Sequence, residues 1–281
     1  MLALASGRRL GLAEYGDPKG APVLVFHGLP GSRRQRHPDD AIARELGART
    51  VHLERPGFGI SDPAPGRALV DWAKDVAEAC DLLGFESVRI AGISGGGPYA
   101  LACAALLGQR VRRAAAVSGV GPPGAAPPSD FTPLVRLAFA LAPRAPWSIR
   151  PFAALGAALA PRLPEKYFEA LGTGLNAADR RVFARAEVRA MFVEDMACAF
   201  AQSGRAFTED LRLIASPWGF DPGAIEVPLG LWHGTEDRIV PVAATRAVAA
   251  RVPRADLHLL AGEGHFFVFE RWREILARLM Q

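Results

Sequence analysis

Short apolar runs alternate with amphipathic stretches along most of the chain. The apolar runs have the length of strands and predict strands at residues 8–15, 22–27, 49–53, 87–91, 111–118, 227–232 and 256–260. The stretches between them place apolar residues at helical spacing and predict helices at residues 39–46, 69–83, 96–107, 242–252 and 270–279. Strands that alternate with helices are typical of βαβ units, so we expect an α/β fold built on a mostly parallel sheet.

The pattern changes in the middle of the chain. After a break rich in Gly and Pro at residues 121–128, the chain from about residue 131 to residue 216 predicts helices only. These helices are expected at residues 134–141, 148–159, 165–171, 177–202 (as one helix or two) and 206–215. A helical block inside an interrupted α/β pattern predicts a core formed by residues 1–122 and 223–281, with a helical cap at residues 123–222.

Composition and charge narrow the classes of function. Half of the 281 residues are hydrophobic and 22% are charged, so the chain can form a sizeable core. The net charge is +4, but the basic residues are scattered rather than gathered in a stripe, so we expect no nucleic-acid partner. No stretch approaches about 18 uninterrupted apolar residues, and the first residues lack the charged region of a signal peptide. We therefore expect no membrane span and a cytoplasmic location.

The most informative motif follows the strand predicted at residues 87–91. Gly92-Ile93-Ser94-Gly95-Gly96 fits the pattern G-x-S-x-G, and a helix is expected directly after it. A strand that turns sharply into a helix strains its central residue and exposes the hydroxyl of Ser94. We therefore predict Ser94 as a nucleophile and the N–H of Gly95 as a donor to an oxyanion. A phosphate-binding turn is the alternative, but no acidic residue ends the following strand and no Gly-Lys-Ser/Thr follows.

A serine nucleophile needs a base and a carboxylate that orients the base, and the chain offers both in later loops. His265 lies in a Gly-flanked loop between the last strand and the last helix, and Asp237 follows the preceding strand. Both loops leave the C-terminal edge of the expected sheet, where Ser94 also lies and where open α/β sheets bind ligands. The order Ser94, Asp237, His265 fits this architecture. Glu236 is a neighbouring acid that the sequence alone does not exclude.

A second loop with a motif of its own follows the strand at residues 22–27. It reads His27-Gly28-Leu29-Pro30-Gly31, and the residue after His-Gly is expected to face the serine turn. We therefore predict the N–H of Leu29 as the second donor to the oxyanion.

Together with Glu54-Arg55-Pro56-Gly57-Phe58-Gly59-Ile60-Ser61-Asp62 and His233-Gly234-Thr235-Glu236-Asp237, these motifs resemble the α/β-hydrolase family over nearly the whole chain. The resemblance implies an eight-stranded sheet with a helical cap between strands six and seven. It also implies that residues 55–62 form a structural turn.

The resemblance leaves several reactions open, because one fold supports many chemistries. Capped relatives such as epoxide hydrolases and haloalkane dehalogenases use aspartate where this chain has Ser94, which argues against both. Proline iminopeptidases need acidic cap residues to hold an ammonium group. Glu194 and Asp195 could serve in that role, or they could simply belong to a solvated helix face.

We expect a serine hydrolase that cleaves an ester or related acyl bond of a small, uncharged apolar substrate. The alternatives are an aminopeptidase of the proline iminopeptidase type, a carbon–carbon bond hydrolase, and a ligand receptor without catalysis. Apolar cap residues are expected in the cap core and around the pocket: Phe139, Trp147, Phe152, Leu155, Phe183, Met191, Phe192, Met196 and Phe200.

This chemistry requires no metal and no organic cofactor. His258, Glu263 and His265 do not have the spacing of metal ligands on one element, and the three cysteines form no CxxC pair. The expected partner is a small-molecule substrate, and the expected assembly is a monomer or a homodimer.

Overall fold

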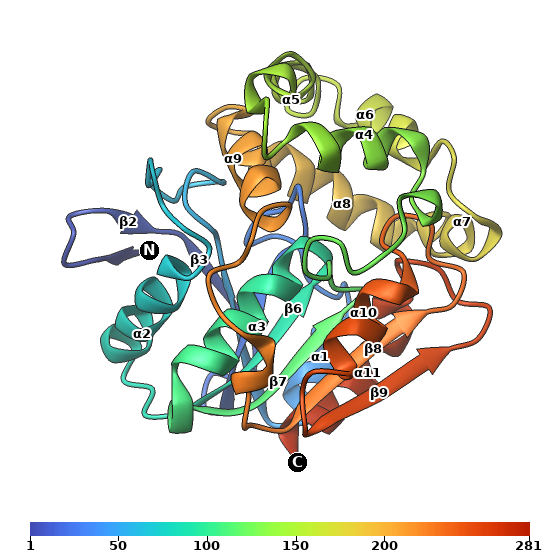
Figure 1. The fold of residues 1–281 in the computed structure, drawn as a ribbon. Coiled ribbons are helices and arrows are strands. Elements are labelled where there is room, and N and C mark those ends of the chain that lie inside the picture. Colours follow the sequence, from blue (N-terminus) through green and yellow to red (C-terminus); the bar gives the residue numbers. More distant parts are fainter.

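The computed structural model describes residues 1–281 and contains one main sheet (Figure 1). Its seven strands lie in the order β3-β5-β4-β6-β7-β8-β9. β3 runs antiparallel to β5, and all the other neighbouring strands are parallel, which confirms the mostly parallel α/β fold. The strands are β3 (Leu12–Gly16), β4 (Ala21–Phe26), β5 (Ala48–Leu53), β6 (Val88–Ile93), β7 (Val111–Val117), β8 (Leu229–Gly234) and β9 (Ala255–Leu260).

The main sheet has seven strands, so the expectation of eight is wrong. The segment predicted as one strand at residues 8–15 is interrupted at Gly11, whose N–H donates to the Ser61 hydroxyl. A backbone donor bound to a side chain cannot join a strand ladder, so regular pairing stops there. Before the break, β2 (Arg9–Leu10) pairs instead with β1 (Leu2–Ala3) in a separate two-stranded sheet.

Helices cover both faces of the main sheet. Alternate residues of β4 show the two faces: Leu24 packs into one hydrophobic core and Val25 packs into the other. Residues of α2 (Asp71–Leu83), α3 (Gly97–Leu106) and α10 (Val242–Ala249) build the first core. Residues of α1 (Ala41–Glu45) and α11 (Val268–Met280) contribute to the second core. The central strands are therefore buried on both sides, which holds their C-terminal ends in place, whereas the edge strands β3 and β9 are only partly buried.

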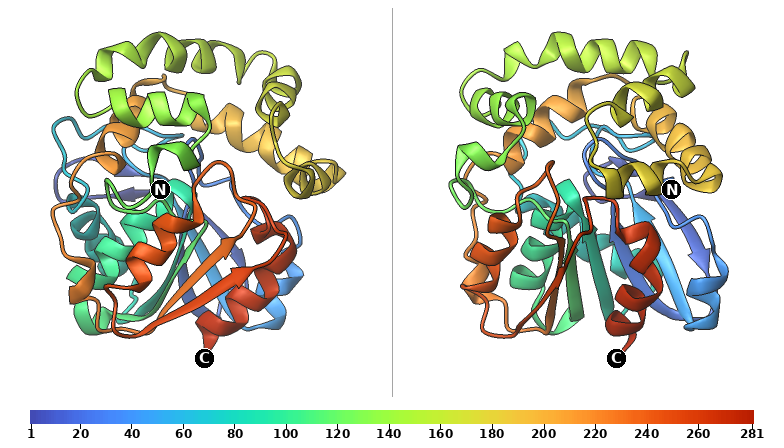
Figure 2. Two further views of the ribbon diagram at one scale, coloured as in Figure 1. Left: turned by 45° about the vertical axis from the view of Figure 1, so that its right-hand side comes forward. Right: turned by 90° about the vertical axis from the view of Figure 1, so that its right-hand side faces the viewer.

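The helical block predicted from the sequence lies between β7 and β8. Its helices are α4 (Pro133–Leu141), α5 (Arg150–Leu159), α6 (Pro164–Gly172), α7 (Ala177–Phe183), α8 (Ala186–Ala199) and α9 (Arg205–Ile214). The stretch expected at residues 177–202 is thus two helices. We call residues 133–214 the helical insertion, which Figure 2 shows as a layer above the sheet, on the side toward which the β8 and β9 arrows point. None of the helices in the structure has both the length and the hydropathy needed to cross a bilayer.

Candidate active site

Ser94 stands at a sharp turn between β6 and α3. Its φ angle is +52°, a left-handed conformation that is strained for a residue with a side chain. The turn needs glycine on both sides of it. A Cβ at Gly92 would collide with the carbonyl oxygen of Gly96, and a Cβ at Gly96 would collide with the carbonyl oxygen of Phe26. The spacing of the G-x-S-x-G motif therefore reflects close packing of strand, turn and helix.

The structure brings His265 and Asp237 to this turn from the loops after β9 and β8. Nε2 of His265 lies 3.0 Å from Oγ of Ser94, and Nδ1 of His265 lies 2.7 Å from Oδ2 of Asp237. The other carboxylate oxygen of Asp237 accepts hydrogen bonds from the N–H groups of Ile239 (2.8 Å) and Val240 (2.9 Å). Both the imidazole and the carboxylate are buried, so their orientations are fixed by the surrounding chain.

The charges of this pair support each other. Burial alone would raise the pKa of Asp237, but His265 and His233 hold that pKa well below its usual range. Burial alone would lower the pKa of His265, but Asp237 more than offsets this effect, so the pKa of His265 is raised above its ordinary 6.5. An ionised Asp237 can only accept, so Nδ1 of His265 carries the hydrogen, and Nε2 is free to accept one from the hydroxyl of Ser94.

The other candidates among the acids and histidines lie elsewhere. Glu236 is exposed, and its backbone N–H donates to the carbonyl oxygen of Glu263. Asp237, not Glu236, is thus the acid in contact with the imidazole of His265. The ring of His258 stacks on that of Trp232 with 3.8 Å between ring centroids, and its Nε2 lies 2.9 Å from the carboxylate of Asp256.

The loop after β4 faces the serine turn. A Cβ built at Gly95 would lie 3.3 Å from the backbone nitrogen of Leu29, and the Leu29 N–H donates no hydrogen bond within the chain. Arg55 fixes this loop from behind by donating to the carbonyl oxygens of His27 and Gly28. The structure therefore places an unoccupied backbone donor next to the turn.

The turn at residues 55–62 supports the site without contacting Ser94. Arg55 is fully buried and forms an ion pair of 2.6 Å with Asp210 of α9. Arg67 and the hydroxyl of Tyr99 also donate to this carboxylate. Two buried guanidinium groups thus share the carboxylate of Asp210, and their charge-assisted hydrogen bonds connect the loop after β4 to α9. Only Nε of Arg67 is left without a partner in this cluster.

Sequence reasoning missed two residues that fix the loop of His265. Ser118 follows β7 with a φ angle of +48°, and its buried hydroxyl donates to the carbonyl oxygen of His265 at 2.9 Å. Asp179 of α7 accepts a hydrogen bond of 2.8 Å from the N–H of Phe266, the residue after His265. No motif or spacing in the sequence connects either residue with His265.

A cavity of about 200 Å³ opens in front of Ser94. Most of its wall is apolar. Besides Ser94, the residues that line it come from the loop after β4, the end of β6, the helical insertion, the loop after β8, and the last loop with the start of α11: Gly28, Leu29, Pro30, Gln35, Ile93, Leu171, Leu175, Phe183, Phe192, Met196, Ile239, His265, Phe266, Val268 and Phe269. Neither Glu194 nor Asp195 lines it. A larger hollow of about 930 Å³ between α4 and the loop at 120–128 contains none of the predicted site residues, so the smaller cavity is the candidate substrate pocket.

The apolar residues expected in the cap have three different environments. Phe183, Phe192 and Met196 line the cavity. Met191 and Phe200 are buried in a hydrophobic core, and Phe139 packs at the edge of one. Trp147, Phe152 and Leu155 are exposed.

Comparison with known proteins identifies the family. The model of the alpha/beta hydrolase fold family matches residues 21–271, so the chain belongs to the α/β-hydrolase family. A 2-hydroxymuconate semialdehyde hydrolase of Pseudomonas putida is 28% identical over 281 residues, which cover 99% of this chain and 91% of that protein. A non-heme chloroperoxidase of Streptomyces lividans is 30% identical over 258 residues, which cover 85% of this chain and 82% of that protein.

Solved structures share the fold at lower identity. The enol-lactonase from Burkholderia xenovorans LB400 superposes with a TM-score of 0.71 at 20% identity, covering 99% of this chain and 98% of that chain. A thermophilic esterase from Thermogutta terrifontis superposes with a TM-score of 0.69 at 20% identity, covering 100% and 98%. The protein is thus an enzyme of the hydrolase class on an α/β-hydrolase fold.

Proposed function

We propose that this protein is a serine hydrolase that cleaves an ester or related acyl bond of a small, uncharged apolar substrate. The observation that carries the proposal is the continuous pair of contacts from Ser94 Oγ to His265 Nε2 (3.0 Å) and from His265 Nδ1 to Asp237 Oδ2 (2.7 Å). A nucleophile, a base and an orienting carboxylate in this order are the parts that acyl transfer requires.

In the proposed reaction, His265 takes the proton of the Ser94 hydroxyl while the serine oxygen attacks the carbonyl carbon. The carbonyl π electrons move to its oxygen, and a tetrahedral intermediate forms. When this intermediate collapses, the bond to the alkoxide leaving group breaks and the proton on His265 passes to the departing oxygen. Water then attacks the acyl-enzyme by the same steps and releases the acid and free Ser94. Asp237 stays ionised and stabilises the imidazolium that forms in each half of the reaction.

The N–H groups of Leu29 and Gly95 are proposed to hold the oxyanion of the tetrahedral intermediate. The position of Leu29 beside Gly95, together with its unoccupied N–H, supports this role. One such donor typically contributes about 3–4 kcal/mol to transition-state stabilisation, so the precise position of this loop matters for the rate.

We propose that residues 123–222 act as a cap over a core of residues 1–122 and 223–281. Support comes from the side chains that the helical insertion supplies to the cavity, among them Leu175, Phe192 and Met196. The cavity is smaller than the roughly 300–1,000 Å³ of typical ligand pockets, and its apolar wall favours a short, uncharged acyl group.

Hydrolysis of a carbon–carbon bond is the second candidate, because the relative from Pseudomonas putida is named for the hydrolysis of a semialdehyde. The muconate in that relative's name is a carboxylate, and an anionic substrate of this kind would need a cation in the pocket. No Lys or Arg lines the pocket, which argues against such a substrate here.

An aminopeptidase would need a carboxylate for the substrate ammonium. The carboxylates considered for this purpose bind elsewhere: Glu194 pairs with Arg34, and Asp195 accepts from Ser32 and Gln35.

Labelling with a fluorophosphonate tests the mechanism, and a panel of substrates tests the reaction. The wild type and the exposed control Ser129→Ala should both be labelled, whereas Ser94→Ala should not. The wild type should hydrolyse p-nitrophenyl acetate and butyrate in preference to proline β-naphthylamide. Folded wild type that resists labelling and hydrolyses no ester would contradict the proposal and favour a ligand receptor.

A further inference from the structure

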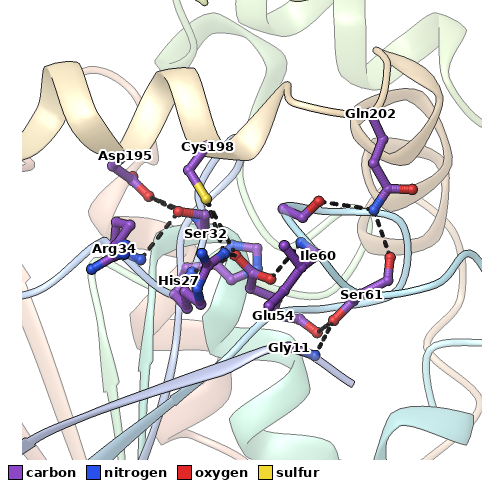
Figure 3. A network of polar contacts seen from close by, with 12 residues as sticks. Gly11, His27, Ser32, Arg34, Glu54, Ile60, Ser61, Asp195, Cys198 and Gln202 are labelled. Atoms are coloured by element: carbon purple, nitrogen blue, oxygen red, sulfur yellow. Dashed lines mark hydrogen bonds and ion pairs between the residues drawn. The ribbon is translucent and has the colours of Figure 1, made fainter. Parts of the chain in front are cut away.

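A carboxylate is buried between the helical insertion and the loop after β4. Asp195 of α8 is fully buried. One of its oxygens accepts from the N–H of Ser32 (2.7 Å) and from the Ser32 hydroxyl (2.6 Å), and the other accepts from the side-chain amide of Gln35 (3.1 Å). Figure 3 shows Asp195 pointing from its helix toward Ser32. No Lys or Arg forms an ion pair with it, so only hydrogen bonds stabilise this carboxylate when it is ionised.

The hydrogen bonds of Asp195 continue through Gln35 to the loop after β4, which contains Leu29. The amide oxygen of Gln35 accepts a hydrogen bond of 2.6 Å from the N–H of Gly28. Gly28 precedes Leu29, and Ser32 follows it by three positions. Asp195 therefore holds the backbone on both sides of Leu29, directly at Ser32 and through Gln35 at Gly28.

The neighbouring charges do not neutralise Asp195. Glu54 is buried close by, but it forms its own ion pair of 2.6 Å with Arg33, and the thiol of Cys198 lies 3.5 Å from it (Figure 3). Arg34 pairs with the exposed Glu194. A buried carboxylate without a cation costs stability, so its presence here is better explained by the geometry that it imposes than by a contribution to folding.

The same insertion also contacts the loops of the other proposed site residues. On α7, Asp179 accepts from the N–H of Phe266, next to His265. The side-chain amide of Asn176, at the start of α7, donates to the carbonyl oxygen of Glu236, next to Asp237, at 2.7 Å. The helical insertion thus bonds to the backbone beside His265 and Asp237, as it does on both sides of Leu29.

We propose that Asp195 is a positioning residue that sets the N–H of Leu29 through Ser32 and Gln35, so that the oxyanion donor is in place only when α8 is docked. This inference rests on the proposed function, since it assumes that Leu29 serves an oxyanion. It assigns the insertion a part in the catalytic geometry in addition to its place in the pocket wall.

The substitution Asp195→Asn tests this relay, by which we mean the hydrogen bonds that lead from Asp195 through Gln35 to the N–H of Gly28. Asn can still accept from Ser32, but its NH₂ then faces the NH₂ of Gln35, and turning the Gln35 amide only moves the clash of donors to the N–H of Gly28. We expect kcat for p-nitrophenyl butyrate to fall by about 10- to 100-fold with KM nearly unchanged, because the oxyanion contact strengthens in the transition state. Glu194→Gln, on the same helix but exposed, is the matched control and should keep the wild-type kcat.

The double variant Asp195→Asn/Gln35→Glu restores the hydrogen bonds from residue 195 through residue 35 to Gly28, with the negative charge on residue 35 instead of residue 195. The NH₂ of Asn at 195 then donates to Glu at 35, whose other oxygen accepts from Gly28. We expect this variant to recover most of the lost kcat. A role limited to stability would instead lower the melting temperature of Asp195→Asn and leave the kcat of the folded fraction unchanged.

The outcomes separate this inference from the proposed function. If wild type is labelled by fluorophosphonate and Asp195→Asn keeps the wild-type kcat, the positioning role is wrong and the serine mechanism stands. If wild type is not labelled, the proposed function itself fails. Should Asp195→Asn not fold, Gln35→Met cuts the relay and leaves the Asp195–Ser32 bonds, and an unchanged kcat in that variant would equally overturn the inference.

Discussion

Nε2 of His265 lies 3.0 Å from Oγ of Ser94, although 171 positions separate the two residues in the chain. The contact depends on the parallel sheet. β6 ends at the turn of Ser94 and β9 ends just before the loop of His265, and both strands point to the same edge. Their loops therefore meet above that edge, beneath the helical insertion.

Activity should fall at low pH with the protonation of His265. The pKa of this imidazole is raised above its ordinary 6.5 because the Asp237 carboxylate more than offsets the effect of burial. Only the neutral imidazole can take the proton of Ser94, so kcat/KM should decline as pH falls through a value above 6.5. The test is the pH profile of kcat/KM from pH 5 to 9 with an uncharged ester. An acidic limb centred below 6.5 would contradict the assigned role.

Asp179→Asn should shift that acidic limb to lower pH. The negative charge of Asp179 helps to raise the pKa of His265, and asparagine removes the charge while keeping an acceptor for the N–H of Phe266. The same pH profile measures the effect. Glu226→Gln, an exposed substitution outside the site, should leave the limb in place, and an upward shift in Asp179→Asn would contradict the electrostatic argument.

Asp237→Asn should lower kcat by about 10⁴-fold, because a neutral amide no longer selects the tautomer of His265 that leaves Nε2 free to accept. Glu236→Gln removes a negative charge from the residue next to Asp237 in the sequence. The side chain of Glu236 is exposed and contacts none of the site residues, so the kcat of this variant should equal that of the wild type. Steady-state hydrolysis of p-nitrophenyl butyrate distinguishes the two variants. Equal losses in both would show that the acid has been assigned wrongly.

The stability gap between wild type and Asp195→Asn should depend on pH. Burial raises the pKa of Asp195 from its ordinary 3.8 to about 7, with Glu54 acting in the same direction, whereas bonds from Ser32 and Gln35 act against it. Below about pH 4 this carboxyl is protonated in both the folded and the unfolded states. As pH rises toward 7, the unfolded chain releases this proton first, so folding loses the stability that the raised pKa provides.

The free energy of unfolding of wild type minus that of Asp195→Asn should therefore decrease between pH 4 and pH 8. Arg33, Glu54 and Cys198 face the same region in both proteins, so the difference isolates Asp195. Urea unfolding at several pH values gives this difference. A gap that stays constant or widens would contradict the burial of an unpaired carboxylate.

Local patterns in the sequence were sufficient to predict the architecture, because the spacing of apolar residues within a segment reflects which secondary structure can bury them. Short apolar runs predicted most strands, and helical spacing predicted most helices, to within a few residues. The glycines around Ser94 predicted the turn, since only glycine fits there. The first strand was the failure. Its break at Gly11 depends on the Ser61 hydroxyl, 50 positions away, and no local pattern contains that contact.

The supporting residues of the site could not be predicted in the same way. Asp195 was considered as a ligand for an ammonium group, yet it does not line the pocket, and its carboxylate accepts hydrogen bonds from Ser32 and Gln35. Ser118 and Asp179 carry no signal of their own, because a lone serine or aspartate gains its role only from the chain that packs against it.

The order and spacing of residues along the chain are enough to predict the α/β architecture, the helical block within it, the sharp turn at Ser94 and the order of the candidate acid and base. Each of these follows from spacing within one segment or from the chain order of segments. Packing in three dimensions was needed to establish that Asp237 rather than Glu236 contacts His265, that the pocket is small and lacks charged side chains from the insertion, and that Asp195 accepts hydrogen bonds from Ser32 and Gln35. Those facts depend on distances between segments remote in the chain, which are set by packing on the sheet and not by any one stretch of residues.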